Sequence, residues 1–124
     1  MTHFITINLP PITKKNSQQI ITIKGRPMII PSKAYKEYEK NCKPFLTPLH
    51  IDYPVNIKCL YYMPTRRKVD LTNLLSATHD VLVKYQVIED DNCKIAYSVD
   101  GSRVFYDKKN PRTVIEITKV DVPN

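Results

Sequence analysis

Apolar and polar residues alternate in three segments of the chain, residues 3–9, 55–63 and 113–120. Successive side chains of a β-strand point to opposite faces, so a period of two predicts three strands that each bury one side. In the middle segment the expected buried positions are Val55, Ile57, Cys59, Tyr61 and Met63. The tyrosine rings at positions 61 and 62 could stack on nucleobases, but an aromatic ring in a strand is more often part of the packing.

Two further parts of the chain have the pattern of β-hairpins. Residues 20–30, "IITIKGRPMII", are apolar on both sides of a turn near Gly25 and Pro27. Residues 94–99 and 103–107 flank the sequence Asp-Gly-Ser, which is typical of a turn. The sequence therefore predicts two hairpins in addition to the three strands.

The spacing of the apolar residues changes to three and four after Asp70. The positions that follow this spacing are Leu71, Leu74, Leu75, Thr78, Val81, Leu82 and Tyr85. Such spacing predicts an amphipathic helix of about four turns. Asp70 is its expected N-cap, where a side-chain oxygen accepts hydrogen bonds from free backbone N–H groups. A shorter, charged helix is expected at residues 33–43, capped by Ser32 and ended by Pro44.

Strands with two helices among them predict an α+β fold built on a mixed β-sheet with two main helices. At 124 residues the chain is near the commonest domain size, so we expect a single domain over residues 1–124. The pattern does not determine which strands pair.

The chain carries 19 Lys and Arg residues against 12 Asp and Glu residues, a net charge of +7. An excess of this size attracts polyanions, of which nucleic acid is the commonest in cells. The alternative is that the charge only keeps the protein in solution, but the excess favours a nucleic-acid partner. Three cysteines, Cys42, Cys59 and Cys93, lie far apart in the sequence, which argues against a disulfide framework and against a zinc site.

The first residues, "MTHFITINLPP", lack the basic start and the long apolar run of a signal peptide. No apolar segment approaches the roughly 20 residues that span a bilayer. We therefore expect an intracellular, cytoplasmic protein without a membrane partner.

Acidic residues are concentrated around the predicted long helix. Asp70 opens the helix just after the basic run 66–68, and Asp90 and Asp91 follow its end. Taken singly, Asp70 is a helix cap, and Asp90 and Asp91 belong to a solvated turn. Taken with the basic run, they are groups that phosphodiester hydrolysis needs, because carboxylates hold Mg²⁺ and basic side chains hold phosphates. A helix of about 15 residues is roughly 22 Å long, so Asp70 and Asp91 need a returning backbone or a second subunit to meet.

The segment "MPTRRKVDLTNLLSATHDVLVKYQVIEDDNCKI" resembles the signature region of the RusA family of Holliday-junction resolvases, which are crossover junction endodeoxyribonucleases. That family has a basic run, then Asp-Leu-Asp-Asn opening a helix with a downstream Asp-Ala-Leu, and Asp-Asp after the helix. The matching pieces here are "RRK", "DLTN", "DVL" and "EDD". A first strand ending in "LPP" before a polar loop, and a final β-strand, extend the resemblance over nearly the whole chain.

The resemblance implies a RusA-like fold and a homodimeric endonuclease that cuts four-way DNA junctions by paired nicks in recombination and repair. It also implies that Mg²⁺, with Mn²⁺ as an alternative, is held by Asp70 and Asp91 as catalytic residues, with Asp90 beside them. Two positions depart from the family: Thr72 stands where it has a second aspartate, and Ser76 where it tends to have a lysine. Thr72 removes one negative charge from the expected site. A second interpretation therefore stays open, a non-catalytic protein that binds DNA junctions or single strands.

Four residues are candidates for supporting roles in the site, namely Thr72, Asn73, Asp80 and Lys94. Asn73 would either bind the metal through its carbonyl oxygen or bond within the first helical turn. Asp80 points about 80° away from Asp70 around the helix, so it cannot replace Thr72 directly. Lys68 and Lys94 are the candidates for the role of the missing lysine.

Basic residues in the loops and at strand ends form the expected DNA-binding surface. They are Lys14, Lys15, Asn16, Arg26, Arg66, Arg67, Lys68 and Arg103, with Lys108, Lys109 and Arg112 as additional candidates. Contacts of this kind go to phosphates, so binding should weaken steeply with salt. The sequence shows no motif for base-specific recognition, which favours recognition of the shape of a branched substrate.

Overall fold

The computed structural model describes residues 2–13, 18–31 and 33–123 and, within the second range, the side chains of residues 22–28. Its strands are β1 (Thr2–Ile7), β2 (Gln18–Ile23), β3 (Arg26–Pro31), β4 (Val55–Met63), β5 (Ala96–Ser98), β6 (Arg103–Tyr106) and β7 (Arg112–Lys119). Its helices are α1 (Lys33–Asn41), the short 3₁₀ helix η2 (Lys43–Phe45) and α2 (Leu71–Lys84). No helix in these ranges has both the length and the apolar character to cross a membrane. Each predicted helix and strand segment is present, and Ser32, the expected cap of α1, lies outside the described residues.

Five strands form one mixed sheet in the order β1-β7-β4, with β5 and β6 both on the remaining side of β4. β1 and β4 pair antiparallel with β7, whereas β5 and β6 run parallel to β4. A parallel pair needs a crossover connection, and α2 provides it between β4 and β5. The predicted α+β fold with a mixed sheet and two main helices is therefore confirmed.

The second predicted hairpin is wrong. β5 and β6 pair with β4 and not with each other, so the turn between them interrupts one edge of the sheet without reversing the chain. Asn56 of β4 holds this turn, because its Oδ1 accepts hydrogen bonds from Ser98 Oγ at 2.6 Å and from the Asp100 N–H at 2.8 Å. Ser102 Oγ accepts the Cys59 N–H at 3.0 Å. The turn thus satisfies a backbone donor of β4 that a separate hairpin would leave unpaired.

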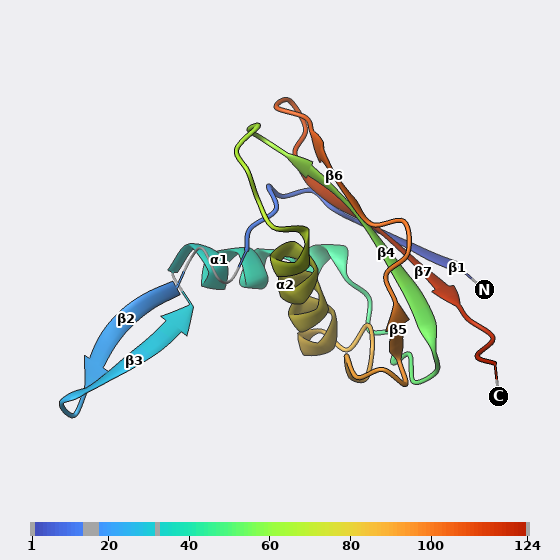
Figure 1. Cartoon of the computed structure of the whole chain (residues 1–124), viewed down its shortest axis with the longest axis horizontal. Helices are drawn as coiled ribbons and strands as arrows, with labels where there is room; N and C mark the ends of the chain where they lie inside the picture. Colours follow the sequence, from blue (N-terminus) through green and yellow to red (C-terminus); the bar gives the residue numbers. More distant parts are fainter. Residues whose placement is uncertain (1, 14–17, 32, 124) are drawn as a thin grey trace.

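The first predicted hairpin is confirmed. β2 and β3 pair antiparallel, and the last pair before the turn is Ile23 with Arg26. Lys24 and Gly25 between them have positive φ angles of 51° and 77°, as a tight two-residue turn requires. This hairpin is a sheet of its own and projects away from the larger sheet beyond α1 (Figure 1).

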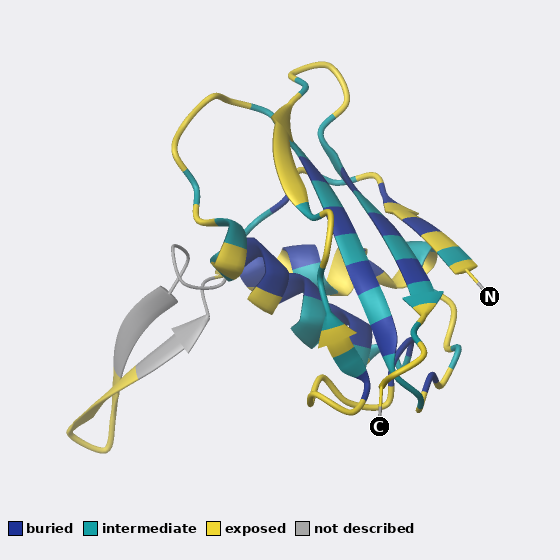
Figure 2. Cartoon of the chain, turned by 45° about the vertical axis from the view of Figure 1, so that its right-hand side comes forward, coloured by how far each residue is buried: buried dark blue, intermediate teal, exposed yellow. Residues whose placement is uncertain are grey.

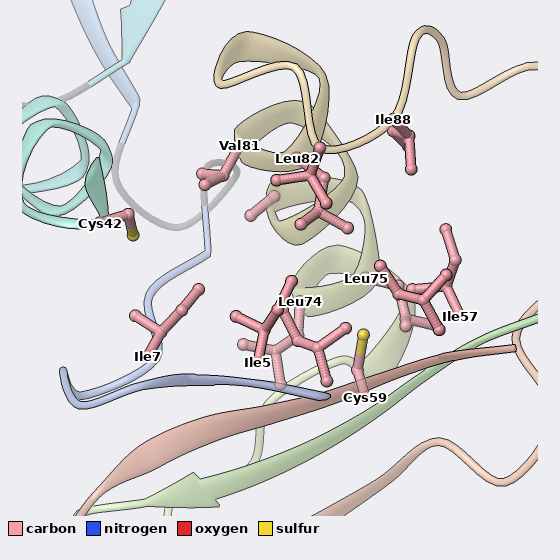
Figure 3. Packing of buried hydrophobic residues seen from close by; sticks show 14 of the residues in the cluster. Ile5, Ile7, Cys42, Ile57, Cys59, Leu74, Leu75, Val81, Leu82 and Ile88 are labelled. Carbon is pink, nitrogen blue, oxygen red and sulfur yellow. The ribbon is translucent and has the colours of Figure 1, made fainter. Parts of the chain in front are cut away.

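The core lies between the larger sheet and the two helices, which cover the same face of it (Figure 1). Four predicted inner positions of β4 are fully buried, namely Val55, Ile57, Cys59 and Tyr61. Figure 3 shows Leu74 and Leu75 of α2 packed over the side of the sheet that carries Cys59. Burial raises the pKa of the Cys59 thiol to about 12. The opposite face of the sheet carries no helix within the described ranges.

A buried hydrogen bond also links the sheet to α2. The hydroxyl oxygens of Tyr61 and Thr78 are 2.7 Å apart, and Thr78 donates its own proton to the Leu74 carbonyl at 3.0 Å. Tyr61 is therefore the donor to Thr78, because a threonine hydroxyl has one proton. This contact fixes α2 against β4, and with it the acidic residue that precedes the helix.

Candidate functional site

Asp70 immediately precedes α2, and its backbone angles, φ −84° and ψ 120°, are those of an N-cap. Its carbonyl oxygen accepts the N–H groups of Asn73 and Leu74 at 3.1 and 3.2 Å. The predicted capping bond of its side chain is not made, because Oδ2 accepts the side-chain amide of Asn73 at 3.1 Å instead. Asn73 thus bonds within the first turn. The Asp70 residue is exposed at the helix N-terminus, so its carboxylate is accessible to a ligand from solvent.

Asp90 and Asp91 lie in the exposed loop between α2 and β5. The loop engages both oxygens of Asp90, which accept the Asp91 N–H at 2.7 Å and the Asn92 side-chain amide at 3.1 Å. The hydrogen bond from the Asp91 backbone is the largest cause that holds the pKa of Asp90 below its ordinary value. Asp90 therefore shapes the loop, and Asp91 is the more available metal ligand of the two.

The loop that carries Asp91 returns along α2 towards His79. The Asp91 carboxylate acts to raise the pKa of His79, although burial has the larger effect and lowers this pKa. The Nε2 atom of His79 is buried and has no hydrogen-bond partner in the described part of the chain. His79 was not among the site residues predicted from the sequence. A signal was available, because Thr72, Ser76 and His79 follow helical spacing and so share one face of α2.

One chain does not gather all the predicted ligands at a single point. The spacing from Asp70 to His79 corresponds to about 13 Å along the axis of α2, and Asp91 lies on the His79 side. Across residues 2–13, 18–31 and 33–123, no three His, Cys, Asp or Glu side chains are close enough together to hold a metal ion. The described part of the chain therefore holds no preformed three-ligand centre.

The remaining predicted site residues lie along α2 and in the loop after it. Thr72 is exposed in the first turn of the helix. Asp80 is half-buried and acts electrostatically on Tyr35 of α1, which fits a structural role between the helices. Lys94 is exposed just before β5. Neither Asp80 nor Lys94 replaces the negative charge that Thr72 removes beside Asp70.

The basic run 66–68 lies in the loop from β4 to α2, next to β6. The guanidinium carbon of Arg66 is 4.1 Å from the centroid of the Tyr106 ring. Arg66 and Arg67 line a hollow of about 270 Å³ together with residues of β6, and Arg67 and Lys68 line a second hollow of about 270 Å³. Within the described residues none of the three forms an ion pair with an acid. Their charges are therefore available to phosphates.

The other predicted DNA-binding residues are spread over the surface. Arg26 is exposed at the turn of the β2–β3 hairpin, and Arg103 is exposed at the start of β6. Arg112 is engaged within the protein, because its Nη1 lies 3.0 Å from Asp107 Oδ2. Three predicted residues lie outside the described part of the chain, namely Lys14, Lys15 and Asn16.

The family model of endodeoxyribonuclease RusA matches residues 8–118 of the chain. The chain belongs to the RusA family. The match begins just after β1 and runs nearly to the end of β7, so it includes α2, Asp70, Asp90 and Asp91. No curated protein sequence matches the chain. The resemblance in the signature region is thus confirmed at the level of the family.

In this RusA-family chain the donor atoms suit a hard divalent metal. Asp70 and Asp91 are exposed and carry carboxylate oxygens, the ligands that Mg²⁺ and Mn²⁺ prefer. The basic run just before Asp70 can bind the phosphate groups of DNA. Both kinds of group that metal-assisted hydrolysis of DNA requires are therefore present on the surface around α2.

Proposed function

We propose that this RusA-family protein is a Mg²⁺-dependent, structure-selective endodeoxyribonuclease that resolves four-way DNA junctions by paired nicks in recombination and repair. One observation carries the proposal. The exposed Asp70 stands at the start of α2, and only Val69 separates it from the basic run 66–68. Within the described residues this run has no acidic partners. A metal ligand and phosphate-binding groups are thereby held side by side in a member of an endodeoxyribonuclease family.

Asp70 and Asp91 are the proposed catalytic metal ligands, with Asp90 beside them, and Mn²⁺ is the alternative to Mg²⁺. The metal would supply activation of a water for attack and stabilisation of the charge that develops on the phosphate and the leaving oxygen. Arg66, Arg67 and Lys68 would hold the phosphate backbone near Asp70. The bonds of Asp90 to the backbone and side chain of its own loop would keep Asp91 in position.

A homodimer is part of the proposal, because the described part of one chain gathers no three acidic or histidine ligands and the Asp91 charge acts on His79, about nine residues along α2 from Asp70. Ligands of Mg²⁺ lie about 2.1 Å from the ion, so two carboxylate oxygens on one ion are at most about 4 Å apart. Asp70 and His79, on which the Asp91 charge acts, are on the order of 13 Å apart along the axis of α2. A second subunit that brings its Asp91 to the Asp70 of the first would complete the site. A symmetric dimer would also supply two sites, one for each of the strands that paired nicks cut.

The second candidate function is a non-catalytic protein that binds DNA junctions or single-stranded DNA. The observation in its favour is the neutral face of α2 next to Asp70, where Thr72 and Ser76 stand. Such a protein would keep the basic surface and would lack turnover. We favour the enzyme because both Asp70 and the Asp90–Asp91 pair are present.

Cleavage of a labelled synthetic four-way junction with Mg²⁺ tests the proposal. The comparison includes the unaltered protein, Asp70→Asn, Asp91→Asn and the control Asp121→Asn, an exposed acid after β7. We expect symmetric, paired nicks from the unaltered protein and from Asp121→Asn. Asp70→Asn and Asp91→Asn should bind the junction and lose at least about a hundredfold in rate, because each removes a charged metal ligand.

Two results would contradict the enzyme. Tight binding of the junction without nicks in all four proteins would establish the junction-binding alternative. Undiminished cleavage by Asp70→Asn would show that the helix N-terminus does not hold the metal. Binding is measured separately, by mobility shift, so that loss of cleavage is not confused with loss of the substrate.

A further inference from the structure

β6 is an open edge of the larger sheet. It pairs with β4 on one side, and no described strand pairs with its other side. All four of its residues are exposed, as Figure 2 shows by the yellow colour along the strand, and three of them are the apolar or aromatic residues Val104, Phe105 and Tyr106. Proteins usually protect edges of this kind with charges, prolines or a covering element. An edge rich in exposed rings therefore suggests a binding surface.

Phe105 is the last member of a stack that crosses three strands on the face of the sheet without helices. The guanidinium carbon of Arg112 in β7 lies 3.8 Å from the centroid of the Tyr62 ring in β4. The rings of Tyr62 and Phe105 are stacked, with centroids 5.1 Å apart and planes at 19°. Asp107 fixes Arg112 at the first end of the stack. At the other end Phe105 is 41% exposed, and within the described residues its second face has no aromatic or cationic partner.

Positive charge lies on both sides of Phe105. A hollow of about 250 Å³ is lined by Phe105, Arg103 and Lys58, and the neighbouring hollow of about 270 Å³ is lined by Phe105, Arg66 and Arg67. Lys58 is 3.9 Å from a carboxylate of β7, whereas the three arginines have no acidic partner in the part of the chain that the structure describes. Pairing of β6 with β6 of a second copy would bring these like charges together. A negatively charged partner with a flat, apolar group fits the surface better.

We propose that Phe105 is the stacking platform for an unpaired nucleobase of DNA, with the flanking phosphates bound by Arg103 on one side and by Arg66 and Arg67 on the other. The stack from Arg112 through Tyr62 holds the Phe105 ring in place, so little side-chain freedom is lost on binding. Every nucleobase has a flat face, so this contact tolerates any sequence and requires a base that is free to leave its own stack. The inference extends the proposed function, because base pairs at the open centre of a four-way junction lack a stacking neighbour on one side and so release a base more easily than pairs within a duplex.

Binding measurements on Phe105→Ala test the platform, with Phe4→Ala as the matched control. Phe4 is 73% exposed on β1 at the opposite edge of the sheet, so its loss removes an exposed ring elsewhere. For single-stranded oligonucleotides and for a four-way junction, we expect Phe105→Ala to weaken binding about 5- to 150-fold, the range for loss of one stacked base. Affinity for blunt duplex DNA and the dependence of binding on salt should not change, because the arginines remain. Phe4→Ala should bind all these DNAs like the unaltered protein.

The absence of tryptophan from the chain allows a direct test of the contact. In Phe105→Trp the new ring is the single tryptophan, and we expect its fluorescence to be quenched by single-stranded DNA while affinity is retained. In Phe4→Trp the same DNA should cause little quenching. Equal affinities of Phe105→Ala and the unaltered protein, or no quenching in Phe105→Trp, would overturn the proposal. A dimer that dissociates in Phe105→Ala and not in Phe4→Ala would also overturn it, because β6 would then be an interface between copies.

The two proposals fail in different ways. If the protein binds single-stranded DNA through Phe105 but does not cut junctions, the proposed platform is supported and the proposed resolvase activity is contradicted. If Phe105→Ala makes paired nicks and binds every DNA with unchanged affinity, the proposed resolvase activity is supported and the proposed platform is contradicted.

Discussion

Thr72, Ser76 and His79 form a stripe on α2 that leads from Asp70 towards Asp91. Residues four and three apart in a helix lie on one face, so these three side chains share one face of α2. Thr72 and Ser76 are neutral where the RusA signature has an aspartate and tends to have a lysine. The proposed site therefore lacks one negative and one positive charge of the signature, and position 72 is where the negative charge can be restored.

Thr72→Asp should strengthen the proposed metal site. A second carboxylate next to Asp70 adds a negatively charged ligand, so we expect cleavage of a four-way junction at limiting Mg²⁺ to rise by at least about tenfold. Thr72→Asn is the matched control, because it has a similar size and no charge, and its rate should not rise. An acid in the first turn also interacts favourably with the helix dipole, so the fold should tolerate the change. Single-turnover rates that agree between Thr72→Asp and the unaltered protein would exclude position 72 from the site.

The sequence predicts residues well where their surroundings are local. Alternation along one strand was enough to place Cys59 in the core, and the change of period was enough to place Asp70 at the N-cap. The same pattern left two roles open for Asn73, as a metal ligand or as a partner within the first turn, and the structure shows its amide bonded to the Asp70 carboxylate. His79, in contrast, was missed. Its surroundings depend on Asp91, which a loop brings back along the helix from a later part of the chain.

At the scale of elements, the course of the chain after α2 could not be predicted from turn residues. The sequence Asp-Gly-Ser does form a turn, and Gly101 there has a φ of 88°. The direction in which the chain leaves that turn is set by the free edge of β4 and by hydrogen bonds to Asn56, which is far away in the sequence. Two short parallel strands replace the hairpin for this reason. The same arrangement leaves β6 at the edge, where the rings of the proposed platform are exposed.

The Tyr61–Thr78 hydrogen bond holds α2 on β4, and its loss should be measurable. Tyr61→Phe removes the donor while Thr78 keeps its bond to a backbone carbonyl, so we expect the free energy of unfolding to fall by about 1 kcal/mol. Thr78→Val leaves the buried Tyr61 hydroxyl without its acceptor, and we expect a loss of about 1–3 kcal/mol. In the double variant neither group is left unpaired, so the combined loss should be smaller than the sum. Urea unfolding measures all three proteins, and additive losses would contradict a hydrogen bond between the two side chains.

At the scale of the whole molecule, the separation of Asp70 and Asp91 decides what the catalytic unit is. The basic run and Asp70 lie at the start of α2, whereas Asp91 lies along the helix beside His79. The rise of α2 from Asp70 to His79, on the order of 13 Å, is about three times the span of two ligands on one Mg²⁺. If both acids act on one phosphate, we expect the unit to be a dimer with composite sites, each with Asp70 from one subunit and Asp91 from the other.

Mixing two inactive variants tests this arrangement. In a dimer of one Asp70→Asn chain and one Asp91→Asn chain, a composite geometry leaves one site with both aspartates and concentrates both changes in the other site. We expect the mixture, after exchange of subunits, to regain nicking of a labelled four-way junction, with one strand cut per binding event and no paired nicks. Each variant alone should remain inactive under the same conditions.

The outcome separates the two geometries because sites within single chains would behave differently. Every site in the mixed dimer would then carry one substitution, and mixing would restore nothing. Co-purification through two different affinity tags shows that mixed dimers have formed, so an inactive mixture would count against composite sites and not against dimer exchange. A restored single nick would support composite sites, in which the second subunit brings its Asp91 to the Asp70 of the first.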